Sequence, residues 1–347
     1  MNKINLDILI RKNILELNSY SSARDEFENN KQNLVFLDAN ESPFQNEINR
    51  YPNNKHINLK QRLLELNQLS YGQIVLGNGT DEILDLIIRV FCDPGCDKII
   101  TIPPTYGMYD VIAKTNNVEN IKVPLKSNFT LNLEELKKSF SKKTKLLFLC
   151  SPNNPTGNSF SRKDLIDLIE SFKGVVVIDE AYIDFSSNSS LVSLINKYNN
   201  LIVTHTMSKA FGMAGIRLGM GFSNKKIINY LNKIKPPYNI NLLTEKRALK
   251  ELENIDSIKA NIKIILEERD KLTTLLKDLS FVTKIYPSDS NFILIKVDDA
   301  DLRYKQLIDK GIVLRNRSKE LLCDNCLRIT IGTPSENEIL FKNFNEL

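Results

Sequence analysis

The sequence predicts an α/β protein with a large, doubly wound, mostly parallel sheet domain and a smaller α+β domain. Between about residues 74 and 222, short apolar runs of strand length alternate with segments of helical periodicity. These runs are continuously apolar, as in parallel strands that are covered on both faces. Beyond Pro236-Pro237 the expected strands cluster instead of alternating. The length of 347 residues fits about two domains.

In the large domain the first strand is expected at 74–76, and the turn Gly77-Asn78-Gly79 leads from it into a helix from about Thr80 to Phe91. Ser161 can cap a later helix in which apolar residues recur at i, i+3, i+4 and i+7. Further strands are expected at 98–102, 145–149, 174–178, 201–204 and 218–222. Strands and helices that alternate in this way form a sheet with helices on both faces.

In the smaller domain, apolar residues recur every three or four positions between 248 and 265, which predicts one long or broken helix. The expected elements that follow are strands near 281–285 and 292–295, a helix near 301–309, and strands at 312–314 and 327–331.

The first 45 residues, with a strand expected at 35–37, do not fit the alternating rhythm. We therefore expect them to join the small domain. The expected division is 1–45 for this N-terminal segment, 46–240 for the large domain and 241–347 for the small C-terminal domain.

Composition excludes several classes of function. The net charge of +5 is mild and is not concentrated in a basic stripe, which argues against a nucleic-acid partner. No apolar run approaches the roughly 18 residues of a membrane span, and Asp7 and Arg11 interrupt the apolar stretch at the amino end. Five cysteines and two histidines favour neither a disulfide framework nor a metal site. We expect a cytoplasmic protein without a bound metal.

Residues with functional chemistry follow the expected strands, where ligands bind in sheets of this kind. The glycine turn opens a helix at Thr80 and Asp81, and free backbone N–H groups there can hold a phosphate. The residues that follow the later strands are Tyr106, the run Asn154-Pro155-Thr156-Gly157, Asp179 with Tyr182, Thr206 with Ser208 and Lys209, and Arg217. Each alone could be an ordinary turn, cap or solvated residue, but together they place an amide, an acid, a phenol and a lysine at one sheet edge.

These residues resemble the fold type I pyridoxal-phosphate-dependent aminotransferases. Asn154, Asp179, Lys209 and Arg217 follow one another at intervals of 25, 30 and 8 residues, which match that family. The chain is most similar to its histidinol-phosphate aminotransferases, from Tyr20-Ser21-Ser22-Ala23-Arg24 through Arg50-Tyr51-Pro52 to the segment at 327–333. The resemblance implies pyridoxal 5'-phosphate as cofactor, bound by the large domain.

The resemblance also implies a role for each residue. Lys209 would hold the cofactor covalently and move the proton at the substrate Cα, Asp179 would pair with the ring nitrogen, and Tyr182 with Asn154 would bond the ring's phenolic oxygen. Tyr106 would stack on the ring. The cofactor phosphate would be held by Thr80, Asp81, Thr206, Ser208 and Arg217, and by Tyr51 of a neighbouring subunit, which implies a homodimer with shared sites.

For the substrate, Arg328 matches the family's carboxylate-binding arginine, and Arg315 could supply a second guanidinium. The resemblance adds Tyr20 and Asn40 to the substrate site. A plainer interpretation makes Arg315 and Arg317 a solvated basic edge.

The expected reaction is amino transfer between L-histidinol phosphate and 2-oxoglutarate, which gives imidazole acetol phosphate and L-glutamate in L-histidine biosynthesis. The motifs leave open an aromatic or other amino-acid aminotransferase and a decarboxylase of phosphorylated amino acids. A cofactor-binding regulator without catalysis is disfavoured, because Lys209, Asp179 and Arg217 are all present.

Overall fold

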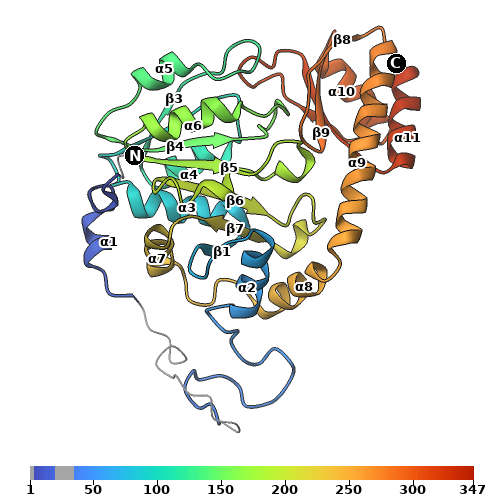
Figure 1. The fold of residues 1–347 in the computed structure, drawn as a ribbon. Coiled ribbons are helices and arrows are strands. Elements are labelled where there is room, and N and C mark those ends of the chain that lie inside the picture. The colour runs from blue at the N-terminus through green and yellow to red at the C-terminus, as the bar shows by residue number, and fades with distance from the viewer. Residues whose placement is uncertain (1–3, 20–34) are drawn as a thin grey trace.

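The computed structural model describes residues 4–19 and 35–347. Its strands form a seven-stranded and a four-stranded sheet, as expected for a large α/β domain and a small α+β domain (Figure 1). Within the described residues, no helix is both long and apolar enough to cross a membrane.

The large sheet has the strand order β1-β7-β6-β5-β4-β2-β3. Strands β2 to β6 run parallel, and only β7 is antiparallel to its neighbours β1 and β6. The strands are β1 (Ile74–Asn78), β2 (Lys98–Thr101), β3 (Glu119–Lys122), β4 (Thr144–Cys150), β5 (Val175–Asp179), β6 (Leu201–Thr206) and β7 (Leu218–Phe222). Six of them lie where the apolar runs predicted them. The sequence pattern gave no sign of β3, an edge strand whose residues are partly polar.

Helices cover both faces of this sheet, and the side chains of successive strand residues pack into two different hydrophobic cores. In β4, Leu147 and Leu149 pack with one cluster, whereas Leu146 and Phe148 pack with the other. The first cluster includes α2 (Ile57–Leu66), α5 (Leu133–Lys138) and α6 (Arg162–Ser171), and the second includes α3 (Gly79–Phe91), α4 (Met108–Thr115) and α7 (Lys225–Ile234). Double coverage explains why these strands read as continuous apolar runs. Ser161 caps α6 as expected, since its hydroxyl accepts from the Asp164 N–H.

The beginning of the chain packs on the large domain. Residues 4–19 form η1 (Leu6–Ile8) and α1 (Lys12–Glu16), which lies beside α7 (Figure 1). Leu6, Ile10 and Ile14 are buried in the same core as α3 and α7. For these residues, the expectation that the N-terminal segment joins the small domain is wrong, because their apolar side chains complete the core beneath the large sheet.

Residues 35–37 do not form the expected strand. Val35 is 82% exposed and Leu37 88%, in a long loop that leads to α2 (Figure 1). The apolar side chains that suggested a strand here are therefore not buried in a sheet of the same chain.

The small domain follows two consecutive helices, α8 (Leu242–Leu252) and α9 (Ile255–Leu275), so the expected helix is a broken one. Its antiparallel sheet has the order β10-β11-β9-β8. The remaining elements are β8 (Val282–Ile285), β9 (Phe292–Val297), α10 (Ala300–Asp309), β10 (Arg315–Asn316), β11 (Cys326–Thr330) and α11 (Pro334–Asn345). The strand expected at 312–314 is displaced, because pairing with β11 begins only at Arg315.

Candidate active site

A pocket of about 470 Å³, counting its open mouth, lies at the carboxyl ends of β4, β5 and β6. Every residue expected to bind the cofactor lines it except Tyr51: Thr80, Asp81, Tyr106, Asn154, Asp179, Tyr182, Thr206, Ser208, Lys209 and Arg217. The structure therefore brings together residues spread over more than a hundred positions of the chain.

One end of the pocket is a backbone cradle at the start of α3. Gly79 has a φ of +72°, and a Cβ there would lie 2.5 Å from Nη2 of Arg217. A Cβ on Gly219 of β7 would lie 2.4 Å from the Thr80 nitrogen. These two glycines let the first turn of α3 approach both β7 and the guanidinium. The helix N-terminus, Arg217 and the nearby hydroxyls of Thr206 and Ser208 make this end suited to an anion.

A buried carboxylate also lines the pocket. It belongs to Asp179, the last residue of β5, which is only 2% exposed. Its carboxylate accepts hydrogen bonds from the Tyr109 hydroxyl at 2.8 Å, the Thr204 hydroxyl at 3.2 Å and the Ala181 N–H at 3.2 Å. Burial raises the pKa of Asp179 above its usual range, against the lowering effect of these bonds. Because all three donors are uncharged, the carboxylate is suited to a cationic ligand group.

Tyr109 is a contributor that the sequence reasoning missed. It is a fully buried residue of α4, stacked on Phe148 with ring centroids 5.2 Å apart. Burial raises the pKa of Tyr109 well above its ordinary value, so the phenol acts as a donor to Asp179. Tyr109 lies three residues after Tyr106, but α4 begins only at Met108, so no sequence pattern pointed to its contact with Asp179.

Lys209 follows β6 and faces the pocket. Its Nζ lies 5.5 Å from the ring centroid of Tyr182. Burial, and secondly the charge of Arg328, lower the pKa of Lys209, whereas the charge of Asp179 partly opposes this. A larger share of the amine is therefore neutral and nucleophilic than for a solvated lysine.

A chain of polar contacts links the pocket to the small domain. The Asn154 amide nitrogen donates to the Tyr182 hydroxyl at 3.2 Å, and Nη1 of Arg328 donates to the Asn154 oxygen. Tyr106 donates to Asp81 at 3.0 Å on the other side of the pocket. Arg328, on β11, is thus placed at the junction between the pocket and the small sheet. Arg315 pairs directly opposite it on β10.

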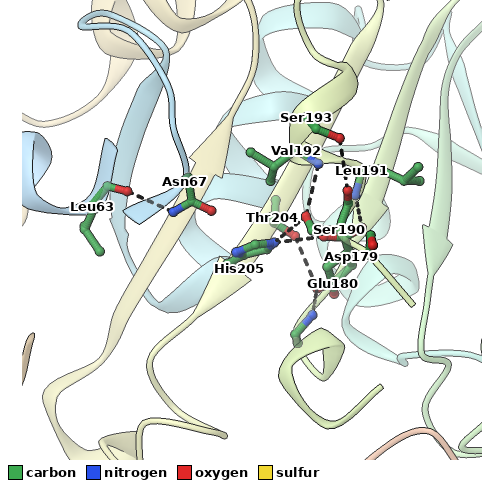
Figure 2. A network of polar contacts seen from close by, with 12 residues as sticks. Leu63, Asn67, Asp179, Glu180, Ser190, Leu191, Val192, Ser193, Thr204 and His205 are labelled. Carbon is green, nitrogen blue, oxygen red and sulfur yellow. Dashed lines mark hydrogen bonds and ion pairs between the residues drawn. The ribbon is translucent and has the colours of Figure 1, made fainter. Parts of the chain in front are cut away.

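Behind the pocket, the strand ends are held by a second network (Figure 2). Glu180 accepts from the Leu191 N–H at 2.8 Å and from the Ser190 hydroxyl, and its Oε2 lies 2.9 Å from Nε2 of His205. Burial by itself lowers the pKa of His205, but the hydrogen bond and charge of Glu180 outweigh it and raise the pKa above its usual value. Because side chains alternate along a strand, Asp179 faces the pocket while Glu180 anchors the opposite face.

The structure does not bring three of the expected residues to this pocket. Tyr20 falls outside the described residues. Asn40 and Tyr51 line a separate, open pocket on the loop before α2, where Tyr51 stacks on Tyr238 with ring centroids 4.5 Å apart. Within one chain, neither residue joins the pocket of Lys209.

Comparison with known proteins agrees with this geometry. Residues 20–344 match the family model described as aminotransferase class I and II. The chain is 54% identical over 340 residues to the histidinol-phosphate aminotransferase of Flavobacterium psychrophilum, covering 98% of both chains. It is also 54% identical over 347 residues to that of Christiangramia forsetii, covering 100% of this chain and 99% of the relative.

Solved structures show the same architecture. The histidinol-phosphate aminotransferase of Clostridium acetobutylicum superposes with a TM-score of 0.80 at 27% identity, covering 86% of this chain and 92% of that one. The enzyme of Sinorhizobium meliloti in complex with pyridoxal-5'-phosphate has a TM-score of 0.78 at 22% identity, covering 86% of this chain and 82% of that one, and shows the shared fold. The expected fold type I arrangement is confirmed. The chain belongs to the aminotransferase class I and II family and, within it, to the histidinol-phosphate aminotransferases.

Proposed function

We propose that the protein transfers the amino group between L-histidinol phosphate and 2-oxoglutarate, giving imidazole acetol phosphate and L-glutamate, as a step of L-histidine biosynthesis. The observation that carries the proposal is an identity of 54% to relatives of that name over nearly the whole of both chains. The intact constellation of Lys209, Asp179 and Arg217 in one pocket supports catalysis rather than a regulatory role.

The residues of the pocket fit pyridoxal 5'-phosphate. The glycine cradle and Arg217 can hold its phosphate through backbone N–H groups and a guanidinium. The buried carboxylate of Asp179, which has only uncharged hydrogen-bond donors, can pair with a protonated ring nitrogen. The Asn154–Tyr182 pair can bond the ring's phenolic oxygen, and Tyr106 can stack on the ring.

When bound, the cofactor supplies an electron sink for the negative charge that develops at the substrate Cα. The protein's own groups do the rest. The Lys209 amine, whose pKa burial lowers, would hold the cofactor and would carry the proton from the substrate Cα. Asp179 would pair with the protonated ring nitrogen, and Tyr109 and Thr204 hold its carboxylate in position.

Substrate binding falls to the small-domain hairpin. Arg328 lies next to Asn154 and can bind the carboxylate of glutamate or the phosphate of histidinol phosphate as a bidentate partner. Arg315, across from it on β10, can add a second guanidinium to the phosphate. The family resemblance adds Tyr20, which lies outside the described residues, and Asn40, which within one chain lines a separate pocket.

We further propose a homodimer in which Tyr51 reaches the cofactor phosphate of the partner subunit. The loop before α2 supports this, since Val35, Leu37 and Phe44 are 82%, 88% and 81% exposed on it. Apolar side chains gathered on one exposed segment are typical of an interface.

The five cysteines are free thiols, which supports the expected cytoplasmic location.

A half-reaction tests the proposed function. Holoenzyme mixed with histidinol phosphate should lose the absorbance of the lysine-bound cofactor and gain that of pyridoxamine phosphate, and 2-oxoglutarate should reverse the change. Release of carbon dioxide would assign a decarboxylase instead. Faster conversion by phenylalanine or tyrosine than by histidinol phosphate would assign an aromatic aminotransferase.

A further inference from the structure

The hairpin of β10 and β11 carries three guanidinium groups on one face. Arg315 pairs with Arg328, and the Arg317 N–H continues the ladder by donating to the Cys326 carbonyl at 2.8 Å. Since side chains alternate along paired strands, Arg317 points to the same side as Arg315 and Arg328. Arg317 was not assigned a role by the motifs.

Several donors of this cluster are buried without a partner. Nε of Arg317, Nε of Arg328 and the hydroxyl of Ser318 are all inaccessible, and none has a hydrogen-bond acceptor among the residues that the structure describes. Buried polar groups are rarely left unpaired, because each costs about 1–3 kcal/mol. The two unpaired guanidinium nitrogens lie on the same face of one short hairpin, which indicates a place where a ligand supplies the acceptors.

The charges of the cluster are unbalanced. Arg317 forms an ion pair with Glu320 at 2.6 Å, and Glu320 is the carboxylate that acts on this group of arginines. Burial, and next the charge of Arg317, lower the pKa of Arg328, with a further contribution from Arg315. Within the part of the chain that the structure describes, Glu320 is the carboxylate that contacts this cluster, so three guanidinium groups leave an excess of positive charge. A phosphate ester carries nearly two negative charges at neutral pH, whereas a carboxylate carries one.

We propose that Arg317 is a third guanidinium of the substrate's anion subsite and determines its preference for a doubly charged phosphate ester over a singly charged carboxylate. Its ion pair with Glu320 moderates that preference, so that glutamate still binds through Arg328 in the other half-reaction. This inference rests on the proposed function, because it requires a phosphorylated amine as one substrate.

The test compares kcat/KM for histidinol phosphate, histidinol and glutamate in the holoenzyme. Arg317→Gln should lower the value for histidinol phosphate about 10- to 100-fold, the effect of losing a hydrogen bond to a charged group. The values for glutamate and histidinol should stay close to wild type. Arg317→Lys should restore part of the loss, and Glu320→Gln should raise the ratio of histidinol phosphate to glutamate. Arg247→Gln, which breaks the exposed Arg247–Glu251 pair on α8, is the matched control.

A pH series separates substrate recognition from a structural role. In the wild type the ratio of kcat/KM for histidinol phosphate to that for glutamate should decline below about pH 6, where the phosphate takes up its second proton. This decline should be weaker in Arg317→Gln.

Equal losses for all three substrates in Arg317→Gln would overturn the inference. If that variant does not fold, an unchanged substrate ratio in Glu320→Gln would overturn it. A wild-type enzyme that does not prefer histidinol phosphate to histidinol would instead refute the proposed function, and the inference with it.

Discussion

At the scale of single residues, the chemistry of the pocket depends on what surrounds two ionisable groups. Burial lowers the pKa of Lys209 and raises the pKa of Asp179, so in both residues it favours the neutral form. In Lys209 this favours the nucleophile, because a protonated amine cannot attack. In Asp179 it favours pairing with a cation, since the isolated charge is poorly solvated.

Replacing Lys209 by Ala should abolish turnover while leaving a folded protein that still binds the cofactor non-covalently. Borohydride reduction of the native holoenzyme should attach the cofactor permanently to Lys209, as peptide mapping would show. A label on Lys173 or another lysine would contradict the assignment.

The neighbourhood of Lys209 also predicts a pH dependence. The rate at which apoenzyme captures the cofactor covalently should rise with pH through the pKa of Lys209. Because the charge of Arg328 helps to lower that pKa, Arg328→Gln should shift the midpoint of the profile to higher pH. Stopped-flow absorbance of cofactor capture would measure it, and a midpoint that stays in place or moves lower would refute this account.

Asp179→Asn should separate catalysis from stability. The raised pKa of Asp179 means that its neutral form stabilises the apoenzyme at low pH and that this stability is lost as pH rises through the folded-state pKa. At pH 7 the Asn apoenzyme should therefore unfold at no lower temperature than wild type. Added cofactor should raise its melting temperature less, and proton removal from Cα should slow by orders of magnitude.

Differential scanning fluorimetry with and without cofactor, together with half-reaction rates, would test the Asp179→Asn variant. An equal gain in melting temperature in both proteins would show that another group pairs with the ring nitrogen. Near-native turnover would show the same.

At the scale of elements, the site depends on how the ends of β5 and β6 are held. Glu180 and His205 form a pair on the face opposite Asp179, and Ser190 and the Leu191 N–H tie that pair to the loop beyond (Figure 2). The arrangement fixes the last residues of two strands whose other faces carry Asp179 and Thr204.

The Glu180–His205 pair should stabilise the fold in a pH-dependent way. The raised pKa of His205 means that the contribution is fully present below its ordinary value near 6.5 and is lost as pH rises through the folded-state value. Glu180→Gln should cost about 1–3 kcal/mol at pH 6. A double-mutant cycle with His205→Gln, measured by urea unfolding, should give a coupling energy that falls between pH 6 and pH 9.

Ser193→Ala, which removes an exposed hydroxyl bonded to the Ser190 carbonyl, is the control for the loop. A coupling energy that is constant with pH would show that His205 is not protonated in the pair.

At the scale of the whole molecule, the long loop before α2 separates Tyr51 from the pocket of its own chain. Its exposed apolar residues and the stacking of Tyr51 on Tyr238 fit a segment that contacts a second subunit. The proposed dimer would complete each pocket with the tyrosine of the other chain.

Hybrid dimers test the shared site. Lys209→Ala and Tyr51→Phe subunits, mixed and allowed to exchange, should form dimers with one fully native site and one doubly altered site. Activity in the mixture should therefore exceed the average of the two separate variants. Activity equal to that average, with exchange verified by differently tagged subunits, would exclude a shared site.

The positions of six of the seven large-sheet strands, and the candidate residues at their carboxyl ends, could be predicted from the sequence alone. Parallel strands buried on both faces appear as continuous apolar runs, and their ends converge at one sheet edge, so Asn154, Asp179 and Lys209 were identifiable by position. The same local reasoning wrongly predicted a strand at 35–37, where the apolar side chains are exposed on a loop and are not buried in a sheet.

Only the tertiary structure decided which distant groups touch. The bond of Tyr109 to Asp179 and the contact of Arg328 with Asn154 join residues 70 and 174 positions apart. The alignment of Arg317 with Arg315 and Arg328 depends on the register of a hairpin. The docking of α1 on α7 depends on a core to which many segments contribute. Periodicity encodes the local conformation of a segment, whereas these contacts arise from packing between segments, which no local pattern specifies.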